Sequence, residues 1–310
     1  MSTARWVRAL RERASPFESQ ASVICERERR PAGGWVDATT VFLRGKECPF
    51  SCVFCDLWRG MLQGPTPPGS VPAQLEAALG KISHRSFIKL YNASSFFDPL
   101  AVPSEDDPAI LKLLRTFEQV TVESHPSLVG ERCVSFALGL EGRLEVAMGL
   151  ETTQPRALAA LNKRMTVADF DGAAAVLRSN GIGIRAFVLF GTPYIDLSEQ
   201  EAWTLRSIEH AAVQGAGVVS IIPVRGGNGA LEELATVGSW SPVTLEMTER
   251  LFARALALDL GDTVVQVDVW DLERLATCPE CFPARRARLE EMNRRGCSTR
   301  SIECSACGRT

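Results

Sequence analysis

The stretch RGKECPFSCVFCD (residues 44–56) holds three cysteines, Cys48, Cys52 and Cys55, in the spacing C-x3-C-x2-C, with Phe54 directly before the third. Three thiolates this close together can hold three corners of an iron–sulfur cube, whereas zinc in a closed structural site takes four ligands. A cube held by three cysteines keeps one iron free for a small molecule. Half of a zinc site, or three unrelated cysteines, are the other interpretations.

The composition is that of a soluble globular protein. Of the 310 residues, 45% are hydrophobic and 23% are charged, and the net charge of −3 gives no argument for nucleic-acid binding. The first 13 residues are polar and rich in arginine, and no apolar run approaches the ~20 residues that span a bilayer. Eight of the ten cysteines fall into two clusters, which is typical of metal binding in a reducing compartment. We therefore expect a cytoplasmic protein without a membrane segment.

Short apolar segments alternate with amphipathic segments along most of the chain. The pattern predicts strands at 39–43, 87–91, 119–123, 144–150, 183–190, 218–223 and 263–269. It predicts helices at 72–82, 108–117, 155–161, 167–179, 198–214 and 242–258. Such alternation indicates a parallel sheet with helices outside it.

The expected fold class is therefore α/β: a full or partial (β/α) TIM-type barrel with a small C-terminal Cys-rich metal-binding appendage. A doubly wound open sheet is the alternative. In a barrel, the active site lies at the carboxyl ends of the strands. We predict an N-terminal extension (1–38), a barrel core (39–271) and a zinc-ribbon-like tail (272–310).

The cysteine stretch resembles the loop of the radical S-adenosylmethionine (SAM) superfamily, in which an aromatic residue lies near the third cysteine. The resemblance implies a [4Fe–4S] cluster on Cys48, Cys52 and Cys55, whose free iron is chelated by the amino and carboxylate groups of SAM. An electron from an external donor then cleaves SAM to methionine and a 5′-deoxyadenosyl radical. The resemblance also implies that Phe54 lies beside the adenine of SAM.

Further stretches resemble the branch of tRNA-modifying and Elongator-like enzymes, and most closely the radical SAM subunit of archaeosine synthase. They are residues 89–99, 122–126, 149–152 with 162–163, and 220–224. This resemblance implies hydrogen abstraction from a modified nucleoside in tRNA, C–N or C–C bond chemistry, and a partner subunit. A radical SAM enzyme for a small metabolite or peptide is one alternative. A non-catalytic metal-binding adaptor for nucleic acid or a partner protein is the alternative of another class.

The resemblance also implies roles for polar residues that follow the predicted strands. Asn92, Ser94 and Ser95 align with the motif that binds the amino group of SAM, although the usual Gly-Gly-Glu is absent here. Glu151 aligns with the position that binds the ribose. The same residues could instead form turns and helix caps.

Two basic residues are candidates to clamp the methionine carboxylate of SAM, Lys163 and Arg185. His125, which precedes a proline at a strand end, is a weak candidate for a proton donor or substrate contact, and a hydrogen-bonded loop histidine is the alternative. The glycine-rich segment 225–229 could cradle a phosphate, but we expect a flexible connection because it lacks the Lys and Ser/Thr of a P-loop.

The tail contains two paired knuckles, Cys278-x2-Cys281 and Cys304-x2-Cys307, separated by 22 residues. This pairing is typical of zinc ribbons, so we expect Zn²⁺ on these four thiolates. In one alternative, Cys297 replaces a knuckle cysteine as a zinc ligand. An auxiliary [4Fe–4S] cluster is the alternative. A basic stretch between the knuckles could contact tRNA phosphates or form a solvated helix face; it comprises Arg285, Arg286, Arg288, Arg294, Arg295 and Arg300.

Overall fold

The computed structural model describes residues 3–11, 20–31, 33–82 and 86–308. Parts of the predicted N-terminal extension (1–2, 12–19 and 32) therefore lie outside the described residues. The division into an extension, a core and a tail stays a prediction. One strand within the extension is nevertheless part of the main sheet.

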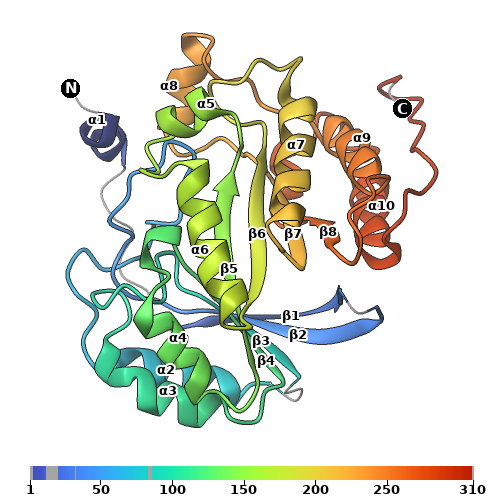
Figure 1. Cartoon of the computed structure of the whole chain (residues 1–310). Helices are drawn as coiled ribbons and strands as arrows, with labels where there is room; N and C mark the ends of the chain where they lie inside the picture. Colours follow the sequence, from blue (N-terminus) through green and yellow to red (C-terminus); the bar gives the residue numbers. More distant parts are fainter. Residues whose placement is uncertain (1–2, 12–19, 32, 83–85, 309–310) are drawn as a thin grey trace.

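The described residues form one sheet of eight strands in sequence order. The strands are β1 (Ser22–Arg29), β2 (Trp35–Phe42), β3 (Phe87–Tyr91), β4 (Gln119–Glu123), β5 (Arg143–Glu151), β6 (Gly183–Phe190), β7 (Val218–Pro223) and β8 (Val264–Val267). β1 is antiparallel to β2, and all other neighbours are parallel. A doubly wound sheet would reverse its strand order near the middle. The sequential order instead makes this a partial barrel of the TIM type, which curls as Figure 1 shows.

Helices link the parallel strands and cover the outer face of the sheet, with one further helix before the first strand and another after the last. They are α1 (Thr3–Leu10), α2 (Ser70–Leu79), α3 (Asp107–Leu114), α4 (Glu131–Gly139), α5 (Pro155–Ala160), α6 (Val167–Ser179), α7 (Gln200–Val213), α8 (Ala230–Thr236), α9 (Leu245–Ala255) and α10 (Phe282–Arg295). Short 3-10 turns lie at Ser104–Asp106, Pro126–Leu128 and Leu272–Leu275. α6 packs on β5 and β6, and α7 packs on β5, β6 and β7 (Figure 1). None of the described helices is long and apolar enough to cross a membrane.

Local sequence explains where individual elements begin. Thr166 and Asp169 form a reciprocal capping box at the start of α6, and the Thr244 hydroxyl caps α9. Pro155 opens α5, where its missing N–H costs nothing. The parallel strands are buried on both faces, because helices cover one face and the barrel interior the other.

Charged side chains fill one part of the concave interior. Arg185 of β6 pairs with Glu145 of β5 and with Glu28 of β1, each at 2.9 Å. Lys89 of β3 pairs with Glu28 as well, and with Glu26 at 2.5 Å. The pairs of Glu28 with Arg185 and with Lys89 join strands that are not neighbours in the sheet, so they cross the interior of the barrel.

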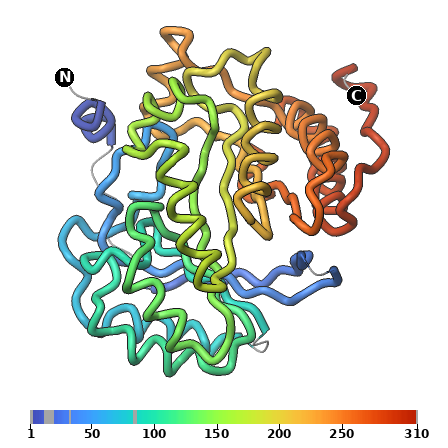
Figure 2. The backbone as a smooth tube through the Cα atoms, viewed as in Figure 1, coloured from blue at the N-terminus to red at the C-terminus, as the bar shows by residue number. Residues whose placement is uncertain are grey.

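The edge strands β8 and β1 are not paired with each other among the described residues, and this opening is here called the seam. Helix α10 packs against both edge strands. The Asn293 side chain accepts from Val267 N–H at 2.9 Å and donates to Val267 O at 2.8 Å, so it satisfies the free edge of β8. At the other edge, the Arg29 guanidinium lies against Gly296, just past α10. Both views show the β1–β2 hairpin extending toward this helix (Figures 1 and 2).

Candidate active site

The cysteine loop follows β2 at the carboxyl end of the barrel. Its two ends are tied together, because Glu47 N–H donates to Leu62 O and Leu62 N–H donates to Gly45 O, both at 2.8 Å. A Cβ atom on Gly45 would lie 2.7 Å from Thr66 Oγ1, so only glycine fits at this close approach. These backbone hydrogen bonds and the close approach at Gly45 therefore fix the conformation at the base of the loop.

Side chains from distant segments hold the loop through its backbone carbonyls. Asn162 donates to Ser51 O at 2.7 Å, Asn228 donates to Val53 O at 2.8 Å, and Arg8 of α1 donates to Pro49 O at 3.0 Å. Asn228 is buried and also caps α8 by accepting from Leu231 N–H. The glycine-rich segment 225–229 is thus a fixed support of the cysteine loop and not the flexible connection expected from its composition.

The three loop thiols lie close enough to influence one another. Burial raises the pKa of Cys52 well above its usual range, and the neighbouring Cys55 and Cys48 raise it further. Burial also raises the pKa of Cys55, to about 12, and that of Cys48. Thiolates that are buried and close to one another require a compensating positive charge, which the metal ions of a cluster provide. The donor set therefore fits an iron–sulfur cluster.

Polar atoms without partners gather beside this loop, at the end of β3. Asn92 is only 3% exposed, yet its side-chain oxygen and nitrogen have no hydrogen-bond partner among the described residues, and neither does the Ser94 hydroxyl. Buried polar atoms in folded proteins are nearly always paired, so unpaired ones at a strand end indicate a bound ligand. Ser95 differs, because its hydroxyl already accepts from His125 N–H at 2.9 Å.

Glu151 and Lys163 form a buried ion pair near the cysteine loop. Lys163 also donates to Gly149 O at 2.6 Å, and a Cβ atom on Gly149 would collide with both members of the pair. Glu151 has a positive φ of 65°, a strained conformation of the kind found at functional sites. Both residues act electrostatically on the Cys52 thiol. Lys163 is thus near the site, but its ammonium is bound to Glu151.

His125 is engaged on both ring nitrogens. Nε2 lies 3.0 Å from Lys163 O and must donate to it, while Nδ1 lies 2.7 Å from the Ser127 hydroxyl. The ring stacks on Phe50 of the cysteine loop, with centroids 4.1 Å apart. Burial and the Lys163 charge lower the pKa of His125 to about 4, so the ring is neutral near neutral pH. This geometry is that of a hydrogen-bonded loop histidine.

Arg185 is not brought to the cysteine loop. Its buried guanidinium is bound to Glu28 and Glu145 in the barrel interior, and it is therefore not available to clamp a carboxylate at the loop. Phe54, by contrast, lies in the loop, is half-buried and packs against the core.

Glu123, which sequence reasoning left without a role, ends β4 beside the loop that contains Asn92. Its carboxylate accepts from Asn92 N–H at 2.5 Å. Burial raises its pKa to about 7, although backbone N–H groups of Asn92, Ala93 and Ser94 oppose that shift. Its position at the carboxyl end of a predicted strand was the available signal.

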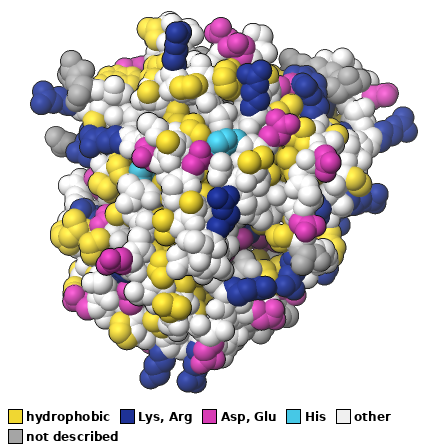
Figure 3. Space-filling view, in the orientation of Figure 1, with side chains coloured by type: hydrophobic (Ala, Val, Ile, Leu, Met, Phe, Trp, Pro, Cys, Tyr) yellow, Lys and Arg dark blue, Asp and Glu magenta, His cyan; other side chains and the backbone are white. Residues whose placement is uncertain are grey.

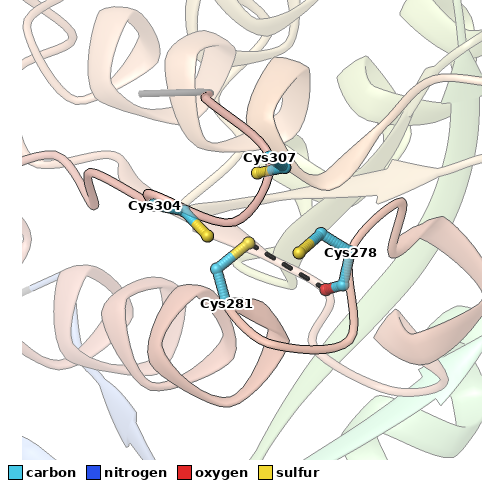
Figure 4. Close-up of side chains that lie close together, drawn as sticks. All are labelled: Cys278, Cys281, Cys304 and Cys307. Atoms are coloured by element: carbon cyan, nitrogen blue, oxygen red, sulfur yellow. Dashed lines mark hydrogen bonds between the residues drawn. The ribbon is translucent and has the colours of Figure 1, made fainter.

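The second metal site lies in the tail. The thiols of Cys278, Cys281, Cys304 and Cys307 converge, with their sulfur atoms within 4.8 Å of one another (Figure 4). Helix α10 occupies most of the spacer between the knuckles, which explains its length. Cys297 lies after this helix, is exposed and is not part of the quartet. The four-cysteine set is therefore complete without it.

The basic stretch of the tail is largely neutralised. Arg285 is buried, donates to the Cys281 sulfur at 3.3 Å and pairs with Glu249 of α9, which also holds Arg288. The exposed arginines 286, 294 and 295 pair with glutamates one turn away on the same helix. Among the side chains coloured in Figure 3, acidic and basic groups are interspersed on the face in view. These contacts favour a solvated helix face over a phosphate-binding surface.

The fold has a counterpart among solved structures. Elp3 of Methanocaldococcus infernus, a radical SAM superfamily member, superposes with a TM-score of 0.54 at 16% identity, over 76% of this chain and 60% of Elp3. This chain therefore shares the partial barrel fold of Elp3. No family model matches the chain.

The sequence relatives are more specific. The chain is 29% identical to archaeosine synthase subunit beta of Methanosarcina acetivorans over 187 residues, which are 56% of this chain and 54% of the relative. It is 22% identical to an uncharacterised protein of Methanocaldococcus jannaschii over 209 residues, which are 63% of this chain and 57% of that protein. The chain thus spans little more than half the length of these relatives.

Proposed function

We propose that this chain uses a [4Fe–4S] cluster on Cys48, Cys52 and Cys55 to cleave SAM, and that it modifies a nucleoside of tRNA. The observation that carries the proposal is a set of buried, unpartnered polar atoms on Asn92 and Ser94. They belong to the loop whose backbone is bound by Glu123, and the charge of Glu123 acts on the Cys48 thiol. When bound, the cluster and SAM supply a 5′-deoxyadenosyl radical that abstracts hydrogen from the substrate.

The residues around the loop have distinct tasks in this proposal. The free atoms of Asn92 and Ser94 bind polar groups of SAM, and the Glu151 carboxylate accepts hydrogen bonds from its ribose. Lys163 holds Glu151 in place through their ion pair, which is a positioning task and not the carboxylate clamp. The stacked ring of His125 shields one side of the loop from water.

The substrate class rests on the relatives. One of them is a subunit of archaeosine synthase, and the resemblance to that branch implies C–N bond chemistry on a modified nucleoside in tRNA. Its designation as a subunit supports a partner subunit for this chain as well. An external reductant and a cytoplasmic location, where thiols stay reduced, complete the proposal.

For the tail quartet, we propose Zn²⁺. Four ligands at the usual Zn–S distance of roughly 2.3 Å place tetrahedral sulfur atoms about 3.8 Å apart. Sulfur atoms within 4.8 Å of one another suit such an ion. An auxiliary cube would hold them farther apart, because each thiolate would bind a different iron.

The proposed activity is tested by anaerobic reconstitution with iron and sulfide, reduction with dithionite, and measurement of 5′-deoxyadenosine formed from SAM. We expect product from the wild type and none from Cys52→Ser. Cys25→Ser, which removes an exposed cysteine on β1, is the matched control and should retain activity. A wild type that holds its cluster but cleaves no SAM would favour the non-catalytic adaptor.

The substrate is tested separately by comparing nucleosides from the tRNA of a deletion strain with those of its parent. The loss of one modified nucleoside, with its precursor accumulating, is the expected result. Unchanged tRNA alongside active SAM cleavage would favour the small-metabolite or peptide alternative.

A further inference from the structure

A cavity lies at the amino-terminal end of the barrel, opposite the end that carries the cysteine loop. It has a volume of about 280 Å³, and its lining includes residues at or next to the first positions of β2 to β7. Because β1 runs antiparallel to β2, its last residue, Arg29, also reaches this end of the sheet, and Arg30 follows directly. The antiparallel first strand is therefore what brings two arginines to the cavity.

The lining of this cavity has an excess of positive charge. Its ionisable side chains are four arginines and two glutamates, which leaves a formal charge of +2, whereas the whole chain has a net charge of −3. Both glutamates are buried and are bound to Arg185 at 2.9 Å. Among the described residues, no Asp or Glu forms an ion pair with Arg29, Arg30 or Arg143. The excess charge therefore lies on these three arginines.

The chain positions two of these arginines without neutralising them. The Arg30 guanidinium lies over Phe87, 5.2 Å from the ring centroid, so its flat face is covered while its N–H edges can still donate. Arg29 lies against the backbone of Gly296, where a Cβ atom would collide with the guanidinium. Arg143, the first residue of β5, is exposed. Guanidinium groups that are already held in place lose little side-chain freedom when they bind a ligand.

The charge of the lining selects the class of ligand. A guanidinium presents a fork of N–H donors that matches two oxygens of a carboxylate or a phosphate. A single carboxylate carries one negative charge, whereas a phosphate monoester carries about −1.5 to −2 at neutral pH. The excess of +2 on three arginines therefore matches a phosphate group better than a carboxylate.

We propose that this cavity binds a phosphate group through Arg29, Arg30 and Arg143. The phosphate belongs either to a small molecule or to the backbone of a nucleic acid, and the recognition chemistry is the same for both. The site is separate from the cysteine loop, and its ligand does not depend on the proposed function. It is a second binding site on the opposite end of the barrel.

The test is calorimetric titration of the 310-residue chain with inorganic phosphate in a chloride buffer of low ionic strength. We expect saturable binding at one site per chain, and weaker binding of acetate, which has a single charge. Arg30→Gln should weaken phosphate binding ~10- to 100-fold, the range for losing one hydrogen bond to a charged group. Arg143→Gln, at an exposed position that tolerates substitution, should weaken it as well.

Two further variants make the result interpretable. Arg27→Gln is the matched control, because Arg27 lies on the same strand, is exposed and pairs with Asp37 at 3.5 Å, outside the cavity lining. It should keep the wild-type affinity. Arg30→Lys keeps the charge but loses the planar fork, so it should retain part of the affinity even if the glutamine variant fails to fold.

The outcomes separate a built site from general surface charge. The inference is overturned if the wild type does not bind phosphate, or if Arg30→Gln and Arg143→Gln bind it as tightly as the wild type. Equal weakening by Arg27→Gln would show a diffuse charge effect and would overturn it too. Adding tRNA to the phosphate-loaded chain distinguishes the two sources, since displacement indicates a nucleic-acid phosphate and no displacement indicates a small molecule. Either result supports a phosphate site, and SAM cleavage is measured independently of it.

Discussion

Arg185 on β6 is paired with Glu28 on β1 at 2.9 Å, although β2, β3, β4 and β5 lie between these strands in the sheet. Both side chains are buried, and this contact crosses the barrel interior. Removing one member leaves an uncompensated buried charge. We expect Arg185→Met to lower the free energy of unfolding by about 3–5 kcal/mol, measured by urea denaturation.

The matched control is the exposed pair Arg27–Asp37 on the same β1–β2 hairpin. Asp37→Asn should cost only about 0–1 kcal/mol, because solvent screens exposed ion pairs. A similar loss in both variants would show that burial does not set the strength of the interior pair.

Asn228 supports the cysteine loop from a distance of 175 residues along the chain. Asn228→Ala leaves Val53 O and Leu231 N–H without their partner, which costs about 1–3 kcal/mol in a buried site. We expect the loop to loosen and the reconstituted protein to retain less iron and sulfide after gel filtration. Asn180→Ala, which removes an exposed amide at the end of α6, should retain as much as the wild type.

The tail quartet should bind one metal ion without Cys297. Cys281→Ser should lower the zinc content from about one ion per chain to nearly none and should reduce the melting temperature, because metal binding contributes directly to folding. Cys297→Ser should change neither quantity. Metal analysis and calorimetry of the two variants measure this, and loss of zinc from Cys297→Ser would contradict the observed quartet.

The stability of the fold should depend on pH through His125. Its pKa is about 4 in the folded protein against an ordinary 6.5, so between these values the unfolded chain binds more protons than the folded one. Stability should therefore fall as the pH decreases across that window. His125→Asn removes this proton linkage and should flatten the profile, measured by urea unfolding at several pH values with metal content held constant. Identical profiles for the two proteins would contradict the assignment of a neutral, buried ring.

Much of the sheet could be predicted because burial on both faces leaves a clear apolar run. The predicted bounds of β3, β4, β6 and β7 match the structure. β1 was not predicted, since Glu26 and Glu28 make it look like a solvent-exposed segment. Their partner Lys89 lies more than 60 residues away, and a local pattern cannot reveal such a pairing.

Helix α10 was foreseen only as an alternative, without bounds, for a related reason. Its buried side chains are Arg285, Leu289 and Met292, so its inner face has no continuous apolar stripe. The structure shows that Arg285 is buried because it pairs with Glu249 on α9. A helix held by buried ion pairs carries a weak periodic signal.

Within the candidate site, local sequence spacing was sufficient to predict the cluster-binding cysteines, but it could not predict where the charged side chains lie. Asn92 and Ser94 could be placed because they directly follow a strand. The interior position of Arg185 could not be inferred, since Glu28 is 157 residues away in the chain. The accepting role of Glu123 likewise depends on contacts between two strand ends, which only the folded chain brings together.

The seam between β8 and β1 has a consequence for how the protein is made. α10 covers this seam, and it lies about 250 residues after β1 in the chain. Contacts between such distant segments form late in folding. Until α10 docks, a nascent chain exposes two unpaired strand edges, which are templates for aggregation. Because Cys281 immediately precedes α10, supply of the proposed Zn²⁺ during synthesis should increase the yield of folded protein.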